Sequence, residues 1–131
     1  MKFLEIEKII LEDDARGMSS LYEKIKKGYI ERSTDLILNT NGKIFISSGF
    51  YILNSKSPET DGPPGVIALA KTLTALGNDV FIVTDKFSID IFKGMYHKDK
   101  VLEFPILSHV ESNSYANKLI KEIDPKLLIS I

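Results

Sequence analysis

The chain has 131 residues, with 17 Lys and Arg against 18 Asp and Glu, no cysteine, 8 glycines and 5 prolines. This length favours one domain whose core needs no disulfides, and a net charge of -1 gives no general attraction to nucleic acid or to a membrane surface. The absence of cysteine excludes a disulfide scaffold and thiolate nucleophiles. Because acidic residues interrupt the N-terminus and no apolar stretch has membrane-spanning length, we expect a cytoplasmic protein that binds neither nucleic acid nor membrane.

The first 42 residues predict helices. Apolar residues recur at helical spacing from Ile6 to Ile10, from Met18 to Ile25 and from Ile30 to about Asn39, and glycines separate these stretches. We interpret residues 1–42 as a helical lead-in to a single α/β domain that covers residues 1–131.

Residues 43–131 predict a parallel sheet. Four short, nearly unbroken apolar runs are typical of strands covered on both faces, and they are Ile44–Ile46, Val80–Val83, Val101–Phe104 and Leu127–Ile131. Helical patterns lie between them, at Val66–Leu76, Ser88–Met95 and Tyr115–Ile123.

We expect a doubly wound, Rossmann-like sheet of about four strands. The second and third strands should lie on one side of the first and the fourth on the other. Ligands of such sheets bind beyond the carboxyl ends of the strands, at the switch point between the first and fourth.

The segment after the first strand, residues 48–65, is the predicted functional loop. It is much longer than a strand-to-helix connection needs, and long ordered loops in compact domains are usually functional. Gly62 and Gly65 allow the backbone to approach a ligand closely, and the helix expected after Pro64 directs its positive end to the same place. Since prolines carry no N–H group, a small carboxylate fits this loop better than a triphosphate does.

Nucleotide binding is the alternative interpretation. Gly62 and Gly65 do not complete a dinucleotide fingerprint, although Asp85 stands near the position of a ribose-binding acid, and there is no P-loop motif. The loop and the segment 76–84 superficially resemble the N-terminal domain of glycogen-synthase-like glycosyltransferases, which is a likeness of scaffold. The alternative function is therefore a non-catalytic anion- or nucleotide-binding module that forms half of a larger assembly.

A more specific resemblance covers nearly the whole chain. The run Glu59–Gly65, with Ser48-Gly49-Phe50 upstream, the segment 76–85 downstream and Asp14-Ala15-Arg16-Gly17 near the N-terminus, resembles the D-glutamate cyclase C-terminal domain family. The resemblance implies a hydro-lyase that dehydrates D-glutamate to 5-oxo-D-proline or acts on a related small carboxylate. The family's domain continues past the strand equivalent to residues 127–131, so we expect a homo-oligomer or a partner chain that completes the domain. We expect no cofactor and no metal, since the two histidines lie twelve positions apart.

The cyclisation needs a base near the amine and a donor near the carboxyl group. Asp61 and Glu59 are the catalytic candidates, as base and as ammonium-recognising group, because both lie in the loop. The substrate-binding candidates are residues of the loop and of the following helix together with one N-terminal arginine: Arg16, Ser48, Gly49, Phe50, Thr60, Gly62, Gly65 and Val66. Structural roles compete with these: Asp61 as a helix cap, Glu59 as a solvated carboxylate and Arg16 as part of an ion pair.

Overall fold

The computed structural model describes residues 3–12, 14–15 and 17–131. The chain divides into two compact units, with the boundary between Thr40 and Asn41. No helix among the described residues is both long and apolar enough to cross a membrane.

Unit 1 is helical, as its apolar spacing predicts. It contains α1 (Phe3–Ile10), α2 (Ser19–Tyr22) and α3 (Tyr29–Leu38). The left-handed backbone of Gly28, with φ of 76°, turns the chain into α3, a conformation that glycine adopts without steric cost.

A buried carboxylate connects the segments of unit 1. Glu7 of α1 accepts hydrogen bonds from the Tyr22 hydroxyl (2.9 Å), from the Gly28 N–H (3.2 Å) and from the Ile30 N–H (3.0 Å). Burial alone would raise the pKa of Glu7, but the hydrogen bonds from Ile30, Tyr22 and Gly28 hold it below its ordinary value. Glu7 therefore fixes α1 against α2 and the start of α3.

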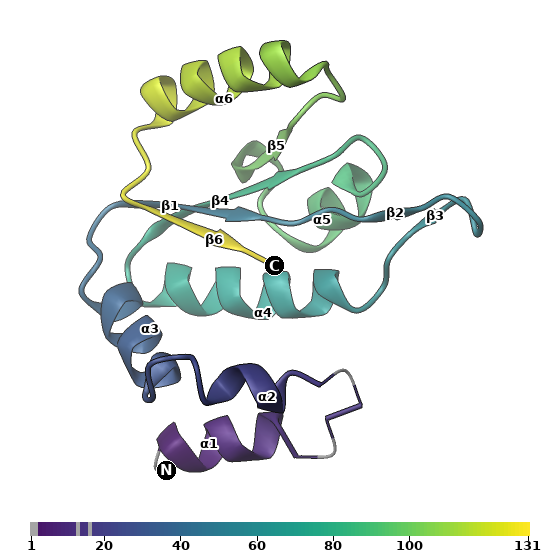
Figure 1. The fold of residues 1–131 in the computed structure, drawn as a ribbon. Coiled ribbons are helices and arrows are strands. Elements are labelled where there is room, and N and C mark those ends of the chain that lie inside the picture. Colours follow the sequence, from purple (N-terminus) through teal and green to yellow (C-terminus); the bar gives the residue numbers. More distant parts are fainter. Residues whose placement is uncertain (1–2, 13, 16) are drawn as a thin grey trace. The chain divides into compact units, whose positions relative to one another are not determined.

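Unit 2 contains the predicted parallel sheet (Figure 1). Its strands are β1 (Lys43–Ser47), β4 (Asp79–Thr84), β5 (Val101–Glu103) and β6 (Leu127–Ser130), in the order β5-β4-β1-β6. All three strand pairs are parallel, and Ile44 of β1 lies between Val80 of β4 and Leu127 of β6. The α/β fold class and the predicted strand order are confirmed, and the switch point falls between β1 and β6.

Helices cover both faces of the sheet, which explains the unbroken apolar strands. Figure 1 shows α4 (Gly62–Ala75) and α6 (His109–Ile123) on opposite sides of it. On the α6 side, Phe45, Phe81 and Val83 form a buried cluster with Leu119 and Ile123. The alternate strand residues project to the other face. The helix α4 buries Val66, Ile67, Ala70 and Leu73, and α5 (Ile89–Met95) and the short helix η1 (Lys98–Lys100) complete the unit.

The structure differs from the sequence prediction in the loop after β1. A small antiparallel hairpin, β2 (Tyr51–Ile52) with β3 (Ser57–Pro58), forms within it. The helix α4 also begins at Gly62, so the prediction that it starts after Pro64 is wrong. Prolines are tolerated in the first turn of a helix, because the N–H groups of that turn have no intrahelical partner.

Candidate functional site

A pocket of about 320 Å³ lies beyond the carboxyl ends of the sheet, beside the switch point. We call it the carboxylate pocket, because two acids are among the residues that line it: Ser48, Gly49, Phe50, Glu59, Asp61, Gly62, Pro63, Ser88, Phe92 and Ile131. Ser48 and Gly49 follow β1, Ser88 follows β4 and Ile131 follows β6. Segments that follow three strands therefore line this pocket together with the predicted functional loop, residues 48–65.

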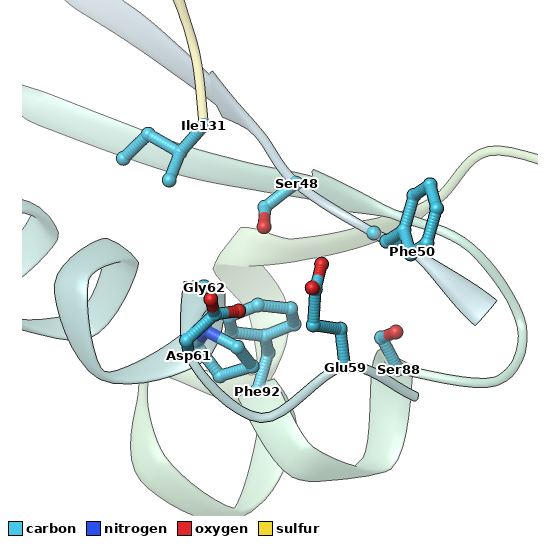
Figure 2. Close-up of a pocket in the computed structure, with 10 residues that line it drawn as sticks. Ser48, Phe50, Glu59, Asp61, Gly62, Ser88, Phe92 and Ile131 are labelled. Atoms are coloured by element: carbon cyan, nitrogen blue, oxygen red, sulfur yellow. The ribbon is translucent and has the colours of Figure 1, made fainter. Parts of the chain in front are cut away.

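The two acidic candidates share the pocket. Figure 2 shows the carboxylates of Asp61 and Glu59 on the same side of the pocket, both directed toward the strand end that carries Ser48. Asp61 is exposed and Glu59 is half-buried. Two carboxylates around one space can take protons from a bound molecule and return them to it.

The position of Asp61 explains why its carboxylate is free. Asp61 is the N-cap residue of α4, yet its side chain makes no cap hydrogen bond. A cap side chain accepts from the N–H of the second or third helical residue, and here those residues are Pro63 and Pro64, which have none. The competing role of Asp61 as a helix cap therefore lacks its hydrogen-bond donors.

Glu59 is placed by the hairpin. Its N–H donates to the carbonyl of Phe50 (2.8 Å), next to the pairing of β2 with β3. The ring of Tyr51 stacks on Phe87, with 3.9 Å between ring centroids, and this contact joins the hairpin to the segment after β4. The hairpin that the sequence did not predict thus holds one of the two acids over the pocket.

The donors in the pocket are neutral. None of the described residues that line it is Lys, Arg or His. The hydroxyls of Ser48 and Ser88 and the N–H of Gly62 remain as groups that can donate to a carboxyl oxygen, since the prolines remove the next two N–H groups. The arrangement suits a ligand that brings both a cationic and an anionic group.

A second pocket, of about 440 Å³, adjoins the first along Ser48, Gly49 and Ile131. Phe104 and Ser112 are among its other lining residues. Among the residues described, no group of three or more His, Cys, Asp or Glu side chains could hold a metal ion.

Residues 6–131 match the sequence model of the family described as D-glutamate cyclase-like, C-terminal. The chain belongs to this family. Comparison with curated proteins gives no match, and neither does comparison with solved structures. The family membership covers both structural units and includes every residue of the carboxylate pocket.

The remaining candidates of this D-glutamate cyclase-like chain lie in different places. Ser48, Gly49, Phe50 and Gly62 line the carboxylate pocket with the two acids. Thr60, Gly65 and Val66 are not among its lining residues, and Val66 is fully buried within the core. Arg16 lies outside the described residues.

Sequence reasoning missed Ser88 and Phe92, which line the pocket from the start of α5 and from within it. The signal that could have found Ser88 is its place shortly after a strand, because the carboxyl ends of parallel strands lie along one edge. No comparable sequence signal distinguishes Phe92 from an ordinary core residue, since its side chain is completely buried.

Proposed function

We propose that this chain converts D-glutamate, or a closely related small amino dicarboxylate, to the cyclic lactam and water at the carboxylate pocket. The observation that carries the proposal is the pair of acids, Glu59 and Asp61, in one pocket of a D-glutamate cyclase-like domain. The neutral donors around them support it.

The reaction requires the protein mainly to position the substrate and to transfer protons. The amine nitrogen attacks the γ-carboxyl carbon, a C–N bond forms, a C–O bond breaks, and both hydrogens that leave the ammonium nitrogen depart on the released oxygen as water. Asp61 accepts a proton from the ammonium group, and Glu59 binds that group on its other side. The Ser48 hydroxyl and the Gly62 N–H donate to the carboxyl oxygens as charge develops on them.

The first test is incubation of the protein with D-glutamate and, separately, with L-glutamate, followed by detection of 5-oxoproline by mass. We expect product from the D enantiomer. The alternative function, a non-catalytic anion- or nucleotide-binding module, gives binding without product.

The second test is Asp61→Asn, with Asp90→Asn as the matched control on an exposed acid of α5. We expect kcat of Asp61→Asn to fall by roughly 100-fold or more, because the proton acceptor is lost. Its Tm should stay at the wild-type value, since Asp61 makes no cap bond. A lower Tm with full activity in Asp61→Asn contradicts the catalytic role.

A further inference from the structure

Ser88 is a buried residue that lines the carboxylate pocket. The residue is only 2% exposed and occupies the N-cap of α5, yet its side chain makes no cap bond. Its hydroxyl makes no hydrogen bond with any other described residue, and Figure 2 shows it at the wall of the carboxylate pocket, near Glu59. A hydroxyl that lines a pocket and has no protein partner can donate to a ligand bound there.

Asp85 holds the backbone of Ser88 in place. One oxygen of Asp85, Oδ1, accepts the N–H of Phe87 at 2.8 Å and the N–H of Ser88 at 2.9 Å. These two bonds hold the turn that leads into α5, and with it the backbone of Ser88. The carboxylate of Asp85 thus fixes the backbone position from which the Ser88 side chain lines the pocket.

The other oxygen of Asp85, Oδ2, lies beside Gly49. A Cβ atom placed on Gly49 would lie 2.6 Å from Asp85 Oδ2, so only a glycine fits there without a shift. Gly49 follows β1 and lines the pocket, and Ser88, which follows β4, lines it too. One carboxylate therefore contacts two of the segments that line the pocket.

We infer that Ser88 contacts the substrate as a hydrogen-bond donor and that Asp85 is the residue that positions it. The inference rests on the proposed function, and it supplies a donor where the prolines of α4 remove two. Ser88 donates its hydroxyl proton to the carboxyl oxygen on which charge develops, while Asp85 fixes the Ser88 backbone and the distance to Gly49.

The direct test compares Ser88→Ala with Ser108→Ala, the same substitution at the serine that does cap a helix, α6. We expect Ser88→Ala to lose about 10²-fold in kcat on D-glutamate, with Tm unchanged. Ser108→Ala should lower Tm by several degrees and leave kcat unchanged. A Ser88→Ala protein with wild-type kcat overturns the inference.

The role of Asp85 is tested by a double-variant cycle. Gly49→Ala should lower kcat because its methyl group meets Oδ2. Asp85→Ser keeps an acceptor for the N–H groups of Phe87 and Ser88 but removes the contact with Gly49, so it should lower kcat with little change in KM or Tm. The combined variant should regain part of the activity lost in Gly49→Ala. Wild-type kcat in Asp85→Ser, or no recovery in the combined variant, overturns the positioning role.

Failure of the proposed function remains distinguishable from failure of this inference. Should the wild-type protein form no 5-oxoproline, titration of the ¹⁵N-labelled chain with D-glutamate decides the matter. The contact is supported if D-glutamate shifts the amide resonance of residue 88 in the wild-type protein but not in Ser88→Ala. No shift of that resonance at any concentration tested overturns it.

Discussion

Two adjacent prolines decide the chemistry at the start of α4. Pro63 and Pro64 fit the first helical turn but offer no N–H group, so the cap residue Asp61 keeps a free carboxylate. The start of α6 is the opposite case. Its cap residue Ser108 exchanges hydrogen bonds with Glu111, and those bonds, first the one from the Ser108 hydroxyl, hold the pKa of Glu111 below its ordinary value. Cap residues at two helices thus have different roles, one in the site and one in stability.

The two glycines of α4 provide a prediction at the residue scale. A Cβ atom on Gly62 would lie 3.4 Å from the Ser48 hydroxyl oxygen, inside the carboxylate pocket, whereas one on Gly65 would meet no atom within 4 Å. We expect Gly62→Ala to lower kcat/KM on D-glutamate roughly 10-fold, which corresponds to about 1.4 kcal/mol. Gly65→Ala should retain activity and gain up to about 1 kcal/mol of stability from helix propensity.

Steady-state kinetics and thermal unfolding of both variants check this prediction. Equal losses of activity in Gly62→Ala and Gly65→Ala would show that the ligand reaches further along α4 than the pocket does, and would restore Gly65 as a contact residue.

Only those site residues that have a recognisable local sequence feature could be predicted from the sequence. Glu59, Asp61 and Gly62 could be chosen because they lie in a long polar loop directly after a predicted strand. Ser88 lies outside that loop, shortly after β4, and only the fold places it in the same pocket as Glu59 and Asp61. That placement depends on tertiary geometry.

At the scale of elements, the strands of the sheet were predictable and the hairpin was not. Buried parallel strands have an apolar pattern of their own, and the parallel order follows from handedness rules. The strands β2 and β3 have two residues each, too few to show a period, and the stack of Tyr51 on Phe87 joins them to the segment that follows β4. Such short elements exist because of their tertiary contacts.

Glu7 provides a prediction at the element scale, within unit 1. Its pKa lies below the ordinary value in the folded unit, so its ionised form stabilises the fold at neutral pH. That stabilisation is lost as the pH falls below about 4.3, the ordinary value for glutamate, and on through the lowered pKa of the folded unit. Glu7→Gln should therefore weaken unit 1 at pH 7 and make its stability less dependent on pH in the acidic range.

Hydrogen exchange at the Gly28 and Ile30 amides measures this effect, because both donate to Glu7. Exchange should be faster in Glu7→Gln at pH 7, and the pKa of Tyr22, which its hydrogen bond to Glu7 raises, should return toward its ordinary value. The control is Glu5→Gln, on an exposed acid of the same helix. Slow exchange at both amides in Glu7→Gln would mean that other contacts hold α1 in place.

At the scale of the whole molecule, the strand order leaves β6 with one paired edge. It pairs with β1 on one side, and no other strand of the described sheet lies beyond it. Leu128 of β6 is 62% exposed, although it lies on the face of the sheet where Phe45 is buried. An open, apolar strand edge is a template for pairing with another chain.

We therefore expect two copies of the chain to pair through their β6 edges about a two-fold axis, which satisfies the free backbone groups and covers Leu128. Sedimentation at micromolar concentration should show a dimer of the wild-type protein.

Leu128→Lys should shift the equilibrium to monomer, because a charge beside the open edge disfavours pairing. Leu76→Lys is the matched control, since Leu76 is similarly exposed (57%) but lies at the end of α4. Because Ile131 lines the carboxylate pocket directly after β6, the monomeric variant should also show a changed KM. A monomeric wild-type chain, or equal effects of the two lysine variants, would contradict pairing through this edge.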